Sequence, residues 1–236
     1  MEIIQSFYYS SDVQRQQEIE HTLKENLNKS YINRIHLFID DRDYNRFMAS
    51  DFQFNMKVIV KRFNSQPTYP ELFKYACAIN DTICCICNSD IEFRIDDANL
   101  CLLEGIRNEK TLYILSRHEY NMTKPQIDSY CGSHDAVIFH STTFNNTIAN
   151  IDTSYINYIQ NTSGIEALLI IFFIDYMHYN VHNPCLQIVL IHNHKSEVRQ
   201  WAANAKLPVG YIHPTPLNLP GVHCAYMINP VIITSR

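Results

Sequence analysis

Apolar and polar residues alternate in short blocks along this chain, and the blocks favour strands and helices in turn. Residues 2–9 and 34–40 follow the two-residue period of a strand. Between them, Ile19, Leu23 and Leu27 recur at the spacing of one helix face, after polar residues suited to capping a helix. The first forty residues therefore predict a β-α-β unit.

The same pattern continues through most of the chain. Further strands are predicted at 57–63, 82–87, 111–116, 136–139 and 187–191, a helix at 67–78 that is opened by Pro70, and a buried helix at 166–179 that is apolar almost all round. Nearly continuous apolar strands that alternate with helices are typical of a mostly parallel sheet covered by helices. The predicted fold class is therefore α/β.

The composition is that of a globular chain. Of its 236 residues, 46% are hydrophobic and 18% are charged, which is enough to build one extensive core. Five of the nine prolines lie beyond residue 206. We therefore expect one domain over residues 1–206, with an extended, proline-rich segment over 207–236 packed on it.

Charge and motif content exclude several classes of protein. The net charge of −5 argues against a general nucleic-acid binder. The longest apolar run, 167–174, is far shorter than the roughly 20 residues of a membrane span, and no basic leader precedes the first strand. The five glycines form no dinucleotide-binding, P-loop or hydrolase motif. Because Cys84, Cys85 and Cys87 lie in an apolar strand, we expect reduced thiols in a soluble, cytoplasmic protein.

The candidate chemistry begins at residues 82–93, where an apolar run is interrupted by Asn88, Ser89 and Asp90. A strand that ends this way presents a carboxylate at the carboxyl edge of the sheet, where ligands of open α/β folds bind. Asp90 is therefore the first candidate metal ligand, and we expect it at the solvent edge. From spacing alone, a turn residue that caps the strand exit is the alternative.

Other candidates stand near further predicted element ends. Asp135 precedes a strand, Glu166 begins a helix, and His192 and His194 follow a strand. One carboxylate with imidazoles suits a divalent ion that also binds a phosphorylated substrate, and Glu166 could serve as a general base. Asp135 could equally be a solvated loop acid, Glu166 could complement a helix dipole, and the histidines could be surface residues. Arg15 could bind a diphosphate or be solvated.

Seven short motifs occur in a characteristic order: Ile3-Ile-Gln-Ser-Phe-Tyr-Tyr9, Arg15-Gln-Gln-Glu-Ile19, Pro67-Thr-Tyr69, Cys87-Asn-Ser-Asp-Ile91, Leu115-Ser-Arg117, Ser133-His-Asp135 and Asn183-Pro-Cys185. Together they resemble GT-A type glycosyltransferases, in particular a group found in large DNA viruses of algae and amoebae and in some bacteria. The resemblance spans most of the chain. It implies a single GT-A (Rossmann-like) domain in the cytoplasm, or in the host cytoplasm for a viral protein.

The resemblance also implies site residues. Asp90 would hold Mn²⁺ (or Mg²⁺), with Asn88 where the family usually has the first acid of an Asp-x-Asp motif, and His192 or His194 would be the late metal ligand. The donor nucleotide would be bound by Phe7, Tyr8, Tyr9, Arg15, Arg62, Tyr69, Asn88 and Ser89.

The implied activity is a metal-dependent hexosyl- or deoxyhexosyltransferase that moves a sugar from a nucleotide-diphosphate donor, UDP being favoured, to a hydroxyl of a glycan acceptor. For inversion, Asp135 or Glu166 would take the acceptor proton; for retention, either acid would position the acceptor. Related proteins tend to have aspartate where this chain has Glu166. Two alternatives stay open: a catalytically silent GT-A-like domain that binds a glycan or a protein, and a nucleotidyltransferase, although the glycine-rich basic loop of that class is absent.

Overall fold

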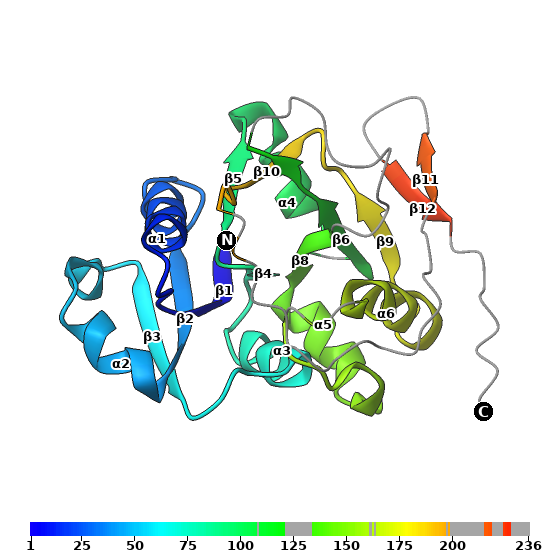
Figure 1. Ribbon diagram of the computed structural model, residues 1–236. Coiled ribbons are helices and arrows are strands. Elements are labelled where there is room, and N and C mark those ends of the chain that lie inside the picture. The colour runs from blue at the N-terminus through cyan, green and yellow to red at the C-terminus, as the bar shows by residue number, and fades with distance from the viewer. Residues whose placement is uncertain are drawn as a thin grey trace.

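The computed structural model describes residues 1–107, 109–120, 134–160, 162, 164–196 and 198, and the backbone of two strands further on. Its strands are β1 (Glu2–Phe7), β2 (Arg34–Asp40), β3 (Val58–Phe63), β4 (Ile83–Cys87), β5 (Ile91–Ile95), β6 (Thr111–Ser116), β7 (His118–Glu119), β8 (His134–His140), β9 (Asn180–Asn183), β10 (Ile188–His192), β11 (Thr215–Asn218) and β12 (Cys224–Met227). Its α-helices are α1 (Val13–Leu27), α2 (Asp41–Met48), α3 (Tyr69–Cys77), α4 (Cys101–Gly105), α5 (Ser141–Ile148) and α6 (Ile165–Ile171). Figure 1 shows their arrangement.

The central sheet has the strand order β11-β12-β9-β6-β8-β4-β1-β2-β3. From β9 to β3, every strand except β8 runs in the same direction, and β8 is antiparallel to both of its neighbours. This confirms the predicted α/β fold with a mostly parallel central sheet flanked by helices. A second sheet, β5-β10-β7, lies beside it. The reversal of β8 was not predicted, because a two-residue period carries no information on strand direction.

Two hydrophobic layers enclose the sheet, and β4 contributes to both. Cys85 and Cys87 pack on the side of α1, α4 and the small sheet, whereas Cys84 and Ile86 pack on the side of α3, α5 and α6. Figure 1 shows α3, α5 and α6 together along one face. All three of these cysteines are buried thiols without a disulfide, as predicted. Burial on both faces explains why β4 reads as a continuous apolar run.

Several boundaries differ from the sequence prediction. The helix expected at 166–179 is α6 followed by a π-helical turn at Phe172–Tyr176. The strand expected at 136–139 is longer and already begins at His134. Of the segment 207–236, the structure describes only β11 and β12, which extend the sheet beyond β9; the rest lies outside the described residues.

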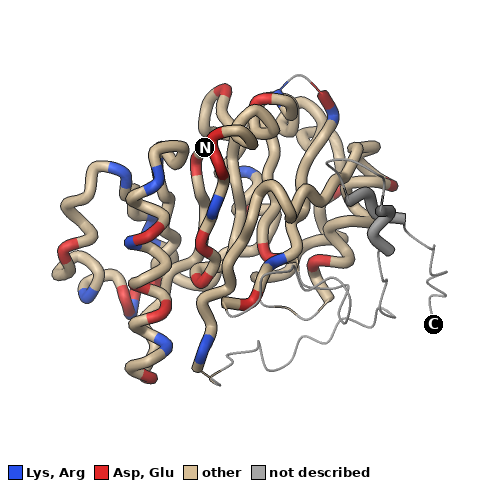
Figure 2. The backbone as a smooth tube through the Cα atoms, turned by 90° about the horizontal axis from the view of Figure 1, so that it is seen from above, with Lys and Arg blue, Asp and Glu red and all other residues tan. Residues whose placement is uncertain are grey.

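The described part of the chain carries both signs of charge. Basic and acidic residues are interspersed along the backbone instead of separating by sign (Figure 2). Within the described ranges, every helix is too short or too polar to cross a membrane.

Candidate functional site

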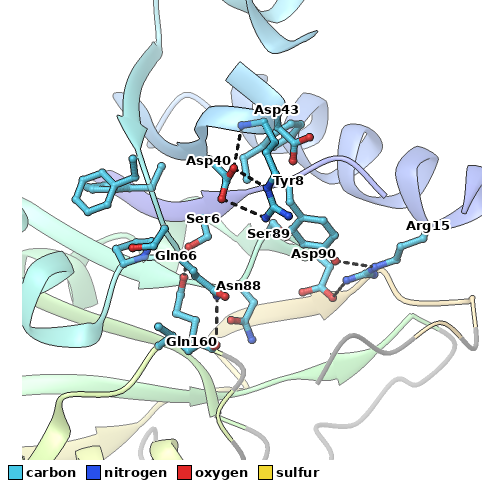
Figure 3. Close-up of a pocket in the computed structure, with 17 residues that line it drawn as sticks. Ser6, Tyr8, Arg15, Asp40, Asp43, Gln66, Asn88, Ser89, Asp90 and Gln160 are labelled. Carbon is cyan, nitrogen blue, oxygen red and sulfur yellow. Dashed lines mark hydrogen bonds and ion pairs between the residues drawn. The ribbon is translucent and has the colours of Figure 1, made fainter. Parts of the chain in front are cut away.

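A pocket of about 310 Å³ opens at the carboxyl ends of β1, β2 and β4 (Figure 3). It is lined by Ser6, Phe7, Tyr8, Arg15, Phe38, Asp40, Arg42, Asp43, Phe63, Ser65, Gln66, Pro67, Asn88, Ser89, Asp90, Ile159 and Gln160. This edge is where ligands of open α/β sheets bind, because strand-end side chains and loop backbone converge there. The fold therefore places the pocket at the expected edge.

The turn after β4 brings polar groups to this edge. Asn88 donates from Nδ2 to Asp135 Oδ1 at 2.8 Å, and its backbone N–H donates to the Asp135 carbonyl at 3.3 Å. Asp90 follows in the same turn but is only 6% exposed. The expectation of a solvent-edge carboxylate was therefore wrong, because α1 and the segment after β10 cover Asp90.

Three side chains from distant segments converge on one oxygen of Asp90. Arg15 Nη2 lies 2.6 Å from Asp90 Oδ2, His192 Nε2 lies 3.2 Å from it, and His194 Nδ1 lies 3.6 Å from it. Burial alone would raise the pKa of Asp90, but hydrogen bonds from the two histidines and the charges of His192 and Arg15 hold that pKa well below its usual range. Asp90 is therefore an ionised, buried carboxylate.

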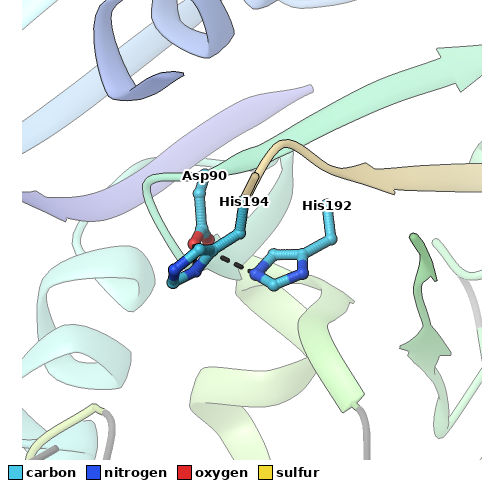
Figure 4. Close-up of side chains that lie close together, drawn as sticks. All are labelled: Asp90, His192 and His194. Atoms are coloured by element: carbon cyan, nitrogen blue, oxygen red, sulfur yellow. Dashed lines mark hydrogen bonds and ion pairs between the residues drawn. The ribbon is translucent and has the colours of Figure 1, made fainter. Parts of the chain in front are cut away.

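The small sheet explains how the histidines reach Asp90. Strand β10 pairs antiparallel with β5, which begins directly after Asp90, and this register sets His192 opposite Ile91. The backbone N–H of Asn193 then donates to the Asp90 carbonyl at 2.9 Å. In Figure 4 both imidazole rings lie beside the carboxylate. The two histidines are not ordinary surface residues, because His192 is buried and the His194 side chain is largely covered.

Asp90, His192 and His194 form a possible metal site, since one ligand atom from each lies within 4.8 Å of the others. One carboxylate oxygen and two imidazole nitrogens are an ordinary donor set for a divalent transition ion. His194 Nε2 is buried and has no hydrogen-bond partner among the described residues, so this nitrogen is available to bind a cation. These residues therefore fit a cation, although Arg15 now neutralises the same carboxylate.

His192 lies between two carboxylates. Its Nδ1 is 2.8 Å from Glu119 Oε2, and its Nε2 faces Asp90. Burial alone would lower the pKa of His192, but hydrogen bonds to Asp90 and Glu119 raise that pKa to about 9. Without a cation, the ring is an imidazolium, so a cation bound here replaces a proton.

Helix α1 supplies a second set of contacts. Arg15 is 5% exposed, so the solvated-face alternative for this arginine was wrong. Its Nε also donates to Tyr8 Oη at 3.3 Å. One turn later, Glu18 accepts hydrogen bonds from the backbone N–H groups of Lys195 and Ser196 at 2.8 and 2.7 Å. Helix α1 therefore holds the segment that follows His194.

Of the residues predicted to bind the nucleotide, Phe7, Tyr8, Arg15, Asn88 and Ser89 line the pocket. The other three do not line it, and each has a different neighbour. The ring of Tyr9 lies 3.9 Å from the Arg46 guanidinium, Arg62 pairs with Asp41 on the exposed side of α2, and the buried Tyr69 stacks on Phe73.

Several further lining residues were not singled out from the sequence, among them Gln160, Asp43 and Asp40. Gln160 accepts from Ser6 Oγ at 2.9 Å and donates to the Cys87 carbonyl at 3.1 Å, so it joins the ends of β1 and β4. Asp43 accepts from the Tyr9 N–H at 2.9 Å. Asp40 is the last residue of β2, and a polar turn likewise follows the last residue of β4. A polar residue at the end of an apolar strand is visible in the sequence, so this pattern could have identified Asp40. No local pattern marks Gln160.

Asp135 and Glu166 form a second group of acids, in addition to the site around Asp90. Asp135 is buried within β8, not in a solvated loop, and pairs with Arg117 Nη1 at 3.1 Å. Glu166 is half-buried in the first turn of α6. Burial is the main cause that raises the pKa of Glu166 to about 8, and the charge of Asp135 adds to it. Both acids also act on Tyr69, whose pKa burial and their charges raise well above its usual value. The two acids therefore share one neighbourhood.

The mostly parallel sheet flanked by helices, with a pocket at its strand ends, defines a Rossmann-like α/β domain. Among solved structures, residues 1–349 of TarS from S. aureus in complex with UDP-GlcNAc align with a TM-score of 0.52 at 6% sequence identity. The alignment covers 84% of this chain and 61% of the TarS chain, so this chain spans less than two thirds of that neighbour.

Two other structures align less well. A second structure of TarS 1–349 has a TM-score of 0.47 at 8% identity, with 83% of this chain and 58% of that chain covered. A Bacillus anthracis protein described as a glucose-1-phosphate thymidylyltransferase has a TM-score of 0.46 at 12% identity, with 77% and 85% covered. Both TM-scores lie below 0.5. The sequence matches no family model and no curated protein.

Proposed function

We propose that this protein is a metal-dependent glycosyltransferase that moves a sugar from a nucleotide-diphosphate donor, with UDP favoured, to a hydroxyl of a glycan acceptor. The convergence of Asp90, His192 and His194 at the edge of a strand-end pocket carries the proposal, because it combines a cation site with space for a nucleotide. The fold shared with TarS, which was solved with UDP-GlcNAc, supports the same donor class.

Asp90, His192 and His194 would hold the cation, and their two imidazoles favour Mn²⁺ over Mg²⁺, which prefers oxygen ligands. When bound, a divalent cation neutralises the charge that develops on the departing diphosphate. Arg15, which is beside both the pocket and Asp90, would exchange its ion pair with Asp90 for one with a donor phosphate. This exchange would free the carboxylate for the cation.

The acceptor would approach from the side of Asp135 and Glu166. For an inverting reaction, Glu166 is the better base of the two, because Arg117 already occupies Asp135 in an ion pair at 3.1 Å. A raised pKa makes the Glu166 carboxylate a stronger base once it has lost its proton. For a retaining reaction, the same two acids would orient the acceptor hydroxyl.

Two observations favour a second candidate function. The 2.6 Å ion pair between Arg15 and Asp90 neutralises the carboxylate without a metal, and Asn88 stands where an acid is usual. Both features suit a catalytically silent domain of this fold that binds a glycan or a protein.

Thermal-shift and calorimetric titrations of UDP and GDP, each with and without Mn²⁺, distinguish the two candidates. We expect a melting-temperature increase with one nucleotide that requires Mn²⁺, since a ligand that binds only the folded state stabilises it. Asp90→Asn, which keeps the shape of the side chain, should abolish the Mn²⁺-dependent part. Asp152→Asn, in an exposed loop, is the matched control and should bind as the unaltered chain does. Absence of any nucleotide-dependent shift would favour the silent domain.

A further inference from the structure

Glu119 is not one of the candidate metal ligands, but its carboxylate contacts one of them, His192. It faces the ring nitrogen of His192 that points away from Asp90. Glu119 lies in the short strand β7, which pairs in parallel with β10 so that Glu119 is in register with His192. Its Oε2 lies 2.8 Å from His192 Nδ1. An imidazole binds a cation through a nitrogen lone pair, and a hydrogen bond at the other nitrogen decides which nitrogen is free.

Both oxygens of Glu119 are committed. Oε1 accepts from Arg117 Nε at 2.9 Å, which leaves Oε2 directed at His192. Arg117 is anchored in turn by Asp135 at 3.1 Å, and Asp135 accepts from Asn88 at 2.8 Å. Glu119 is therefore a fixed acceptor, held by Arg117 on one oxygen and facing His192 with the other.

We propose that Glu119 is a positioning residue that holds the His192 ring with Nδ1–H directed at its own carboxylate and Nε2 directed at the cation beside Asp90. The proposal rests on the metal site of the proposed function. Glu119 contacts neither donor nor acceptor in this role; it acts through His192, and Arg117 acts through Glu119.

The chain contains a matched control. Glu2 Oε2 lies 2.9 Å from His36 Nε2 in a second buried carboxylate–imidazole pair, which sits where β1 begins, at the opposite edge of the sheet from the pocket. Glu2→Gln and Glu119→Gln therefore remove the same charge from the same kind of pair. Of these two pairs, only Glu119–His192 includes a candidate metal ligand.

The experiment is calorimetric titration of Mn²⁺ into the unaltered chain, Glu119→Gln, Glu2→Gln and Asp90→Asn, with circular dichroism to verify folding. Glu119→Gln should weaken Mn²⁺ binding about 10- to 100-fold, as loss of a carboxylate behind a ligating histidine does elsewhere, whereas Glu2→Gln should leave the affinity unchanged. With Co²⁺ in place of Mn²⁺, Glu119→Gln should also shift the visible absorption band, because the ligand field at His192 changes.

Unchanged affinity and an unchanged Co²⁺ band in Glu119→Gln would overturn the positioning role, while loss of binding in Asp90→Asn would still uphold the metal site. Equal losses in Glu119→Gln and Glu2→Gln would overturn it as well, because they would indicate a general effect on the fold. Failure of the unaltered chain to bind Mn²⁺ or Co²⁺ would overturn both the positioning role and the metal-dependent function.

Discussion

At the scale of single residues, the site depends on charges held in a largely buried setting. One oxygen of Asp90 accepts from Arg15 and His192, which are themselves buried, and lies 3.6 Å from His194 Nδ1. Removal of one member's charge leaves an uncompensated buried charge, which commonly costs about 3–5 kcal/mol. Isosteric variants such as Asp90→Asn avoid the added cost of a cavity but not this cost, so each must be checked for folding before a loss of binding is assigned to the site.

Glu166 offers a residue-scale prediction on pH. Its pKa, raised to about 8 mainly by burial, means that the carboxyl group is mostly protonated at neutral pH. If Glu166 is the base, turnover should rise with pH up to about 8, and Glu166→Gln should lower turnover much more than donor affinity and remove that rise. A Gln variant with an unchanged pH–rate profile would move the role to Asp135 or to no side chain.

The same shift has a consequence for stability. Because the folded-state pKa of Glu166 lies above the unfolded value, the unfolded chain loses this proton first, and stability falls as pH rises from the unfolded value to about 8. Glu166→Gln should therefore melt at a higher temperature than the unaltered chain near pH 8, and the difference should vanish at acidic pH. Thermal melts across this pH range measure both.

At the scale of elements, sequence patterns predicted what is local and missed what is tertiary. The apolar run of β4 and the helical spacing of α1 reflect burial of each element, so both were predicted. The direction of β8 and the burial of Arg15 depend on partners far along the chain. The spacing of apolar residues within one element carries no information on such partners. Asp90 and the two histidines, which the structure brings together, could be singled out because residues at strand ends share an edge, whereas Gln160 and Glu119 carry no such local signal.

Helix α1 provides an element-scale prediction, because it carries both Arg15 and Glu18. Its N-cap is Asp12, whose Oδ1 accepts from the Arg15 backbone N–H at 2.7 Å. Asp12→Ala should lower the free energy of unfolding by about 1 kcal/mol, whereas Asp12→Asn, an equally good cap, should cost little. Denaturant melts measure both. Donor affinity in Asp12→Ala should stay close to that of the unaltered chain; a large loss would show that the cap also sets the position of Arg15.

At the scale of the whole molecule, the thiols of β4 report on opening of the entire core. Cys84, Cys85 and Cys87 contribute to both hydrophobic layers, and burial raises the pKa of Cys85 well above its usual value. A thiolate is the reactive form, so these thiols should react only when the sheet opens. The exposed Cys101 needs no such opening.

Site-resolved alkylation followed by peptide mapping should therefore label Cys101 before the thiols of β4, with Cys84, Cys85 and Cys87 following together at the rate of global unfolding. A nucleotide with Mn²⁺ at about 100 times its dissociation constant should slow the labelling of these three roughly 100-fold, because binding lowers the unfolded population by that factor. Labelling of Cys101 should not change. If the nucleotide raises the melting temperature yet leaves the β4 thiols equally reactive, the core opens without disassembling the site, and the two layers are not one cooperative unit.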